Sequence, residues 1–225
     1  MGTGQNRTHM IYVAPDLKSI VTTNVSSATV TIIEKSTRPA GGPPPGGPPP
    51  GGANRPLRHG PSRPSGGPPP GAPGGDWDET VIPVGHGSEG FDISPDNSEI
   101  WVANGQDGTI SIIDRKSKQV TQTVAANLPG PNRLRFTPDG KLVLISNLGG
   151  PDVYVFDAAT RKLIKRIPIG TGSAGIVMQP DGTRAFVACS PDDYLAVIDL
   201  KSLAVTGHID VGAEPDGVAW ATAPH

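Results

Sequence analysis

The stretch FDISPDNSEIWVANGQDGTISIID, residues 91–114, decides the fold because it recurs, with changes, along the chain. Its counterparts are residues 11–34, 134–157 and 176–199. The prolines Pro95, Pro138 and Pro180 mark the register and are 43 and 42 residues apart. A fourth, Pro15, precedes Pro95 by 80 residues. A register that is held over four copies predicts a repeat architecture with one long insertion in its first copy.

Each copy divides into short segments that have the pattern of β-strands. In the copy quoted above they read FDI, EIWVAN and TISIID, and QVTQTV follows at residues 119–124. These segments are alternating and rich in β-branched residues, and none shows a helical period. After each turn proline the hairpin needs a left-handed residue, a role that suits Asn97, Gly140 and Gly182. Leu17 fits this role poorly, so we expect a distorted first turn.

The second strands carry a family resemblance. They read VTTN (21–24), WVAN (101–104), LISN (144–147) and FVAC (186–189), each followed by a strand like V-x-V-I-D. These repeats resemble the YVTN family of β-propellers, although no copy spells YVTN and Cys189 replaces the fourth asparagine. The resemblance implies a ring of about seven blades of four antiparallel strands. It also implies a protein that is periplasmic or secreted.

The predicted fold is therefore all-β, a β-propeller with about four blades of four strands plus one extra inner strand at 215–220, as part of a larger propeller. The predicted boundaries are 1–38 for the first three strands of the first blade, 39–75 for the insertion, 76–86 for the fourth strand, 87–128, 129–170 and 171–212 for the other blades, and 213–225 for the extra strand and tail. Both ends of the chain carry an inner-strand pattern. We therefore expect an N-terminally truncated propeller or an assembly with another chain, and self-association through the exposed blade ends.

The insertion at residues 39–75 is compositionally distinct, with 14 prolines, 12 glycines and no acidic residue. It lacks the apolar content that offsets the entropy of ordering, so we expect a disordered spacer with polyproline II bias. The alternatives are a proline-rich ligand for an aromatic groove and a weak basic contact.

Composition excludes several classes of protein. The net charge is −2, which gives no reason to expect a nucleic-acid partner. A single cysteine excludes internal disulfides. No apolar run has the ~18 residues of a membrane span. No export signal is visible at the N-terminus, which a lost N-terminal segment would explain.

Two glycine motifs and three asparagines have structural interpretations. Residues 85–90 and 170–175 match G-x-G-x-x-G, but both precede a predicted strand rather than the helix that a dinucleotide site needs. We interpret them as loops between blades. Asn24, Asn104 and Asn147 end second strands, where we expect them to serve as turn formers.

One position departs from the repeat in its chemistry. It lies six residues before each turn proline, at the start of the inner strand, where the resemblance implies the mouth of a central channel. Its occupants are His9, Glu89, Asn132 and Ala174, with Asp216 in the extra strand. His86 and Arg133 lie beside this ring. Polar residues that differ between copies predict a ligand site, although a solvated rim would look the same. Such nitrogen and oxygen groups could hold a divalent ion.

We expect a noncatalytic binding or scaffold module that holds a small-molecule ligand or protein partner at the channel mouth. No metalloprotease motif, nucleophile elbow, P-loop or glycosidase carboxylate pair is present, so no catalytic or metal residue is assigned and no cofactor is evident. The alternative is a propeller enzyme, lactonase-like or quinoprotein-dehydrogenase-like, with a metal or cofactor at the mouth. Fold alone does not decide between these functions.

Overall fold

The computed structural model describes residues 3–36 and 77–221, which form 16 β-strands. The helical content of these ranges is one short 3₁₀ helix, η1 (Ser190–Asp192). In the part of the chain that is described, no helix has the length and apolar character needed to cross a membrane. The predicted all-β class is confirmed, whereas the insertion predicted at 39–75 lies outside the described residues.

The strands form four antiparallel sheets, each made of four strands that are consecutive in the chain, and we name them blades 1 to 4. Blade 1 consists of β1 (Thr8–Val13), β2 (Ser19–Asn24), β3 (Thr29–Lys35) and β4 (Trp77–Pro83). Blade 2 consists of β5 (Ser88–Ile93), β6 (Glu99–Asn104), β7 (Thr109–Asp114) and β8 (Gln119–Val124). Blade 3 consists of β9 (Pro131–Phe136), β10 (Leu142–Asn147), β11 (Asp152–Asp157) and β12 (Leu163–Pro168). Blade 4 consists of β13 (Ser173–Met178), β14 (Arg184–Cys189), β15 (Tyr194–Asp199) and β16 (Ala204–Asp210). This arrangement confirms the prediction of a propeller with about four blades.

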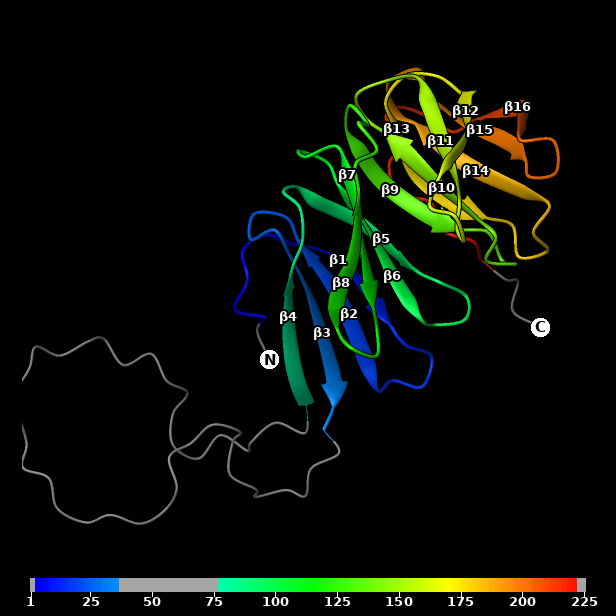
Figure 1. Ribbon diagram of the computed structural model, residues 1–225. Coiled ribbons are helices and arrows are strands. Elements are labelled where there is room, and N and C mark those ends of the chain that lie inside the picture. The colour runs from blue at the N-terminus through cyan, green and yellow to red at the C-terminus, as the bar shows by residue number, and fades with distance from the viewer. Residues whose placement is uncertain (1–2, 37–76, 222–225) are drawn as a thin grey trace, which may run out of the picture.

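The blades follow one another in chain order along an open arc, with blade 1 at one end and blade 4 at the other (Figure 1). Their first strands, β1, β5, β9 and β13, form the inner edge of the arc, and each contacts the next. Because all four inner strands run the same way, their starts gather at one end of the blades. We call this end the mouth.

Buried apolar side chains fill the space between successive blades. Trp101 of β6 and Phe136 of β9 meet edge to face between blades 2 and 3, with ring centroids 5.5 Å apart. Successive residues of a strand face opposite neighbours, because side chains alternate across a sheet. Ile145 therefore packs toward blade 2, whereas Leu144 packs toward blade 4. This is why the central strands are apolar on both faces.

The turn between the first two strands is the same in all four blades. Leu17, Asn97, Gly140 and Gly182 all have positive φ, between 58° and 73°. The N–H of Leu17 donates to the Ala14 carbonyl at 2.8 Å, as the N–H of Gly140 donates to Thr137. The expectation of a distorted first turn is therefore wrong. Leucine is held in the left-handed conformation that the repeat imposes.

The extra inner strand expected at 215–220 is not a strand, and the seventeen strands expected are 16 in the described residues. The segment nevertheless lies where a fifth inner strand would lie. Gly175 of β13 donates its N–H to the Asp216 carbonyl at 3.0 Å. Trp220 lies near Phe186, with ring centroids 6.0 Å apart, as Phe136 lies near Trp101 two blades earlier. Within the described ranges no second strand pairs with this segment, so it stays irregular.

The two glycine motifs lead into β5 and β13, as the structural interpretation requires. Gly87 and Gly172 have positive φ. A Cβ atom on Gly90 would lie 2.4 Å from the Asn132 carbonyl oxygen, so this glycine permits the close contact of β5 with β9. The glycines therefore serve blade packing.

The repeated asparagines are buried and act mainly as cross-strand anchors. Asn24 Nδ2 donates to Thr29 Oγ1 at 3.0 Å and to Thr31 Oγ1 at 2.9 Å. Asn104 makes the same pair of contacts one blade later. Only Asn147, among the three, has a side chain that bonds the turn backbone, accepting from Gly149. The expectation of turn formers is thus correct for one of the three.

Cys189 stands where the other blades have asparagine. It is fully buried, and its Sγ lies 3.5 Å from the Ile169 carbonyl oxygen. Burial, together with the charge of Asp192, raises the pKa of the thiol to about 11. The thiol therefore stays protonated and unreactive at neutral pH.

Candidate functional site

The mouth contains a cluster of charged side chains centred on Glu89 of β5. Arg7 Nη2 lies 3.7 Å from Glu89 Oε1, and His9 Nδ1 lies 3.3 Å from Glu89 Oε2. Arg133 Nη1 lies 3.9 Å from the same Oε2 atom. These groups come from β1, β5, β9 and the residue before β1, so three blades contribute. They meet because the starts of neighbouring inner strands lie side by side.

Arg133 is the most firmly positioned cation of this cluster. Its Nη1 donates to Asn132 Oδ1 at 2.9 Å, and its backbone N–H donates to Ser146 Oγ at 3.0 Å. Asn132 is buried and most of the Arg133 side chain is covered. A guanidinium that is already held in place loses little entropy when it binds a further group.

The structure brings together four of the six predicted site residues and leaves two apart. His9, Glu89, Asn132 and Arg133 form one cluster, whereas His86 and Asp216 do not join it. We call the four, with Arg7, the mouth cluster.

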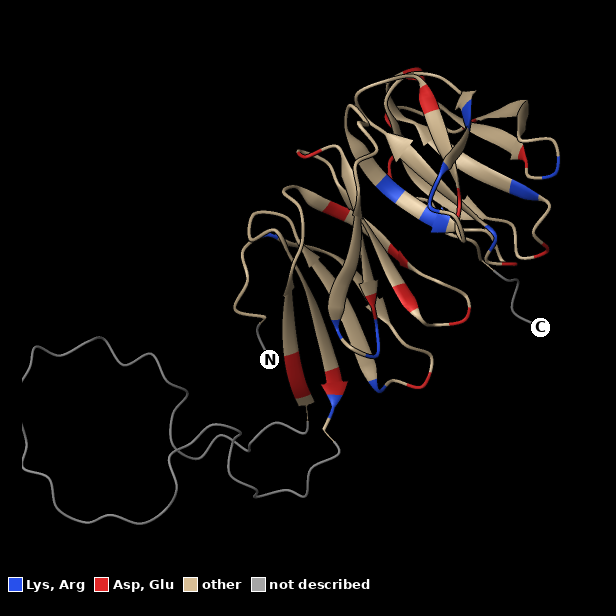
Figure 2. Ribbon diagram, viewed as in Figure 1, with Lys and Arg blue, Asp and Glu red and all other residues tan. Residues whose placement is uncertain are grey.

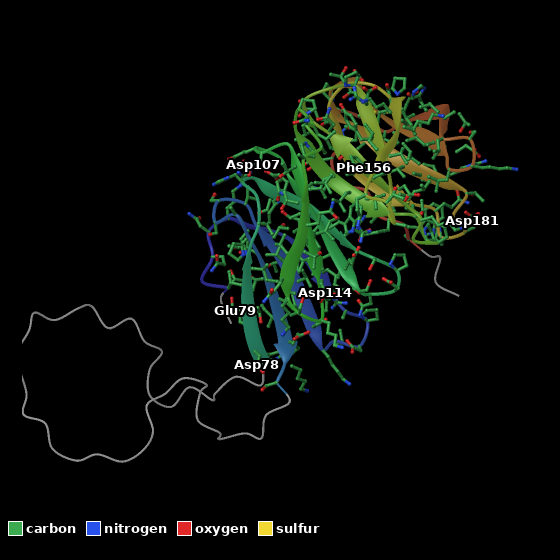
Figure 3. The ribbon with its side chains drawn as sticks, in the orientation of Figure 1. Asp78, Glu79, Asp107, Asp114, Phe156 and Asp181 are labelled. Atoms are coloured by element: carbon green, nitrogen blue, oxygen red, sulfur yellow. The ribbon has the colours of Figure 1, made fainter. Side chains whose placement is uncertain are left out.

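The two excluded residues have other contacts. His86 Nδ1 lies 3.2 Å from both carboxylate oxygens of Asp107, and the His86 N–H donates to Asp107 Oδ2 at 2.7 Å. These hydrogen bonds lower the pKa of Asp107. Asp216 is exposed and contributes its carbonyl to Gly175. Figure 3 labels Asp107 and Asp114 at opposite ends of blade 2, and the mouth cluster lies at the Asp107 end, where β5 begins.

A second ion pair lies further along the same strands. Arg135 Nη1 is 3.0 Å from Asp92 Oδ1, and its Nε donates to the Ile176 carbonyl at 3.3 Å. Asp92 Oδ2 accepts from the Phe136 N–H at 2.9 Å. Burial raises the pKa of Asp92, against the opposing effect of Arg135 and these hydrogen bonds. Two layers of charge therefore run across β5 and β9, which carry the red and blue bands in Figure 2.

Sequence reasoning missed Arg7, Asp92 and Arg135. A signal existed for the last two. The position three residues before each turn proline holds Tyr12, Asp92, Arg135 and Val177, which differ as much as the residues of the predicted ring do. Arg7 precedes its strand, and its only signal is that it replaces a glycine, since its counterparts Gly87, Gly130 and Gly172 are all glycines.

Small hollows adjoin both layers. One, of about 120 Å³, is lined by Arg133 and Arg135 together with apolar side chains such as Phe91, Leu134 and Ile176. Another, of about 150 Å³, is lined by Glu89 and Asn132 and by the loop glycines of blades 2 and 3. Each hollow therefore has at least one residue of the mouth cluster in its lining.

The mouth cluster offers two guanidinium groups against one carboxylate, with His9 as a third nitrogen donor. Guanidinium groups bind carboxylates through paired, charge-assisted hydrogen bonds. In residues 3–36 and 77–221 no group of three or more His, Cys, Asp or Glu side chains is arranged to hold a metal ion. The expectation of a divalent ion at the mouth stays a prediction.

Comparison with known proteins identifies a family model that matches this chain and solved structures with a similar fold. The model of a family described as YNCE-like beta-propeller matches residues 72–224, more than half of the chain. A search of curated proteins finds no match. Among solved structures, Kuenenia stuttgartiensis hydrazine synthase is similar at 17% identity and a TM-score of 0.67, over 94% of this chain and 51% of that one.

Two further structures are similar in fold. A protein of unknown function from Desulfotomaculum acetoxidans aligns at 15% identity and a TM-score of 0.69, over 96% of this chain and 60% of that one. A provisionally assigned 6-phosphogluconolactonase from Bacteroides uniformis aligns at 16% identity and a TM-score of 0.66, over 92% of this chain and 56% of that one. The chain thus spans between 51% and 60% of the length of these structures. At such identities the likeness concerns the fold alone.

Proposed function

The chain belongs to the YNCE-like beta-propeller family, and on this premise we propose that it is a noncatalytic binding module that holds a carboxylate-bearing ligand at its mouth. The ligand is a small molecule or the acidic side chain of a protein partner. The observation that carries this proposal is the position of Arg133, held by Asn132 and open to a hollow shared with Arg135.

The charge balance of the mouth cluster supports an anionic ligand. Arg7 and Arg133 share the single carboxylate of Glu89, at distances of 3.7 and 3.9 Å that are longer than a tight ion pair. A ligand carboxylate that approaches Arg133 closely would make shorter contacts than Glu89 does. The apolar side chains of the adjoining hollow, Phe91 and Leu134 among them, suit the carbon skeleton of such a ligand.

The enzyme alternative is lactone hydrolysis or a metal- or cofactor-dependent oxidation. Its support is the fold shared with the Bacteroides uniformis protein, at 16% identity. The ionisable groups at the mouth instead pair with one another across blades, which suits a binding surface.

We also propose a periplasmic or extracellular location for this binding module, and fractionation of the native host tests it.

The test is a thermal-shift titration of the full chain with gluconate, glutamate and an acidic peptide, with spermidine as a cationic probe. A probe at a hundred times its Kd stabilises the folded state by about 2.7 kcal/mol. We expect at least one carboxylate to raise the Tm, Arg133→Met to abolish the shift, and His86→Ala to retain it. His86 is the matched control because it lies at the same end of the blades but outside the mouth cluster.

Three results would overturn the proposal. The first is the absence of a shift with any carboxylate, and the second is an equal shift in Arg133→Met. The third is stoichiometric calcium or transition metal in the purified protein, together with hydrolysis of 6-phosphogluconolactone, which would establish the enzyme alternative.

A further inference from the structure

Blade 1 exposes an apolar face that the other blades bury. Ile11 of β1 is 64% exposed. Its counterparts in the repeat are Phe91, Leu134 and Ile176, and each of these is buried in the core that its blade shares with the preceding blade. Val13, two residues further along β1, is exposed as well. The face of blade 1 that carries Ile11 and Val13 therefore has the composition of a blade interface.

Blade 4 exposes an apolar face on its other side, the side that packs against the following blade elsewhere in the chain. Ile209 of β16 is 44% exposed, whereas two of its three counterparts, Ile82 and Ile167, are buried against the following blade. The third, Val124, is partly buried and packs on the core between blades 2 and 3. Leu195, which pairs with Ile209 across the strands, is also only partly buried. This face therefore has the composition of the other half of a blade interface.

The two faces are complementary, as the interior of the chain shows. Ile82 of blade 1 packs in the same core as Phe91 of blade 2, and Ile167 of blade 3 packs in the same core as Ile176 of blade 4. Ile209 is the counterpart of Ile82 and Ile167, and Ile11 is the counterpart of Phe91 and Ile176, but the two residues lie at opposite ends of the arc of blades. We propose that two copies associate head to tail, so that blade 4 of each copy packs on blade 1 of the other and the eight blades close a ring.

Ring size and charge support a second copy of the chain as the partner of these two faces. Propellers close with 4 to 8 blades, and head-to-tail contacts form closed rings when the rotation permits. The similar structures are longer than this chain, which covers 51% to 60% of them. Arg7 precedes β1, while Asp210 and Glu214 lie at the end of β16 and beyond it, all exposed and all at the mouth. Opposite charges would therefore meet at the interface.

The segment at residues 215–221 competes with the second copy. Its contacts through Asp216 and Trp220 occupy, against blade 4, the place of a following inner strand. The incoming β1 must displace this segment. The segment thus caps the single chain, as terminal repeats are capped in other repeat proteins, and weakening the cap strengthens the association.

The experiment is sedimentation equilibrium of the full 225-residue chain, with variants on exposed positions that folding does not need. We expect a dimer of twice 23.2 kDa. Ile11→Glu and Ile209→Glu should each weaken association at least tenfold, and Trp220→Ala should strengthen it. Ile164→Glu is the control, because Ile164 is equally apolar and exposed but lies on the outer strand of blade 3.

Mixing the two glutamate variants identifies the geometry. A mixture of Ile11→Glu and Ile209→Glu retains one native interface, between the intact blade 4 of one and the intact blade 1 of the other, and should recover the dimer. Failure of the mixture to associate, or association that Ile209→Glu leaves unchanged, would overturn the head-to-tail arrangement. If both the unaltered chain and Trp220→Ala were monomeric at about 100 μM, the interface itself would be overturned. Open filaments would overturn ring closure.

Discussion

The guanidinium carbon of Arg161 lies 5.2 Å from the ring centroid of Trp101, although the two residues belong to different blades. Arg161 lies in the turn between β11 and β12 of blade 3, and Trp101 is on β6 of blade 2. Glu99 joins them, because one of its carboxylate oxygens pairs with Arg161 and the other accepts from Trp101 Nε1 at 3.0 Å. These three side chains hold blades 2 and 3 together at the end opposite the mouth.

Arg161→Ala should lower the free energy of unfolding by about 1 to 2 kcal/mol, since it removes a cation–π contact and a partly buried ion pair. This change does not remove backbone strain, because alanine is as strained as arginine at the positive φ of this residue. Urea denaturation measures the effect. Arg166→Ala is the control, because Arg166 lies over Tyr154 within its own blade. Equal losses in the two variants would contradict a contact between blades.

Leu17→Gly should stabilise the protein by about 0.5 to 1 kcal/mol. Leu17 has a φ of 58° and a side chain that is 69% exposed, so glycine removes backbone strain and loses little packing. The matched change in the other direction is Gly140→Ala, at the equivalent turn, which should destabilise. Thermal unfolding of both variants gives the comparison. A lower Tm for Leu17→Gly would show that the exposed leucine makes a stabilising contact.

The fold was predictable from the sequence because the repeat recorded it four times. Turn prolines, alternating β-branched strands and three of the four left-handed turn positions agreed, and the structure confirms the four sheets. Two local expectations are wrong for the same physical reason. The turn at Leu17 and the segment at 215–220 depend on their neighbours. The pairing of β1 with β2 imposes the turn on an unsuitable residue, and the lack of a described partner strand leaves the segment irregular.

The site was only partly predictable. Sequence comparison between copies located His9, Glu89, Asn132 and Arg133, because residues at equivalent positions are brought to one end of the blades. It could not show which neighbours pair. His86 lies close to Glu89 in sequence, but its loop directs it toward Asp107. The pairing of Asp92 with Arg135 depends on contact between β5 and β9, which no local pattern contains.

Gly90→Ala should destabilise the protein by about 1 to 3 kcal/mol, since the new methyl group would overlap the Asn132 carbonyl oxygen of the next blade. The same change should disturb the mouth cluster, because Glu89 precedes this glycine. Gly207→Ala is the control, since a Cβ atom there meets nothing within 4 Å. Chemical denaturation compares the two. If both variants were as stable as the parent, the close approach of β5 and β9 would not be required.

Asp157→Asn tests the acid stability of the β11–β12 turn. Hydrogen bonds from the backbone N–H and hydroxyl of Thr160, both at 2.7 Å, lower the pKa of Asp157 from 3.8. Stability from a lowered pKa is complete above the unfolded value and is lost as pH falls through the folded one. The advantage of the parent over Asp157→Asn in free energy of unfolding should therefore shrink as pH falls from about 5 to about 2. A constant difference would mean that the carboxylate is not favoured by the turn.

Asp92→Asn should show the opposite dependence on pH. Burial raises the pKa of Asp92 above 3.8 in the folded state, despite Arg135. Between 3.8 and the raised value the folded state binds more protons than the unfolded state, so stability falls as pH rises through this window. Asparagine does not titrate, and the advantage of the parent over Asp92→Asn should therefore decrease as pH rises. Denaturant melts at a series of pH values measure both aspartate variants together. If the advantage of the parent over Asp92→Asn instead grew with pH, as expected at Asp157, the ion pair with Arg135 would outweigh the effect of burial on Asp92.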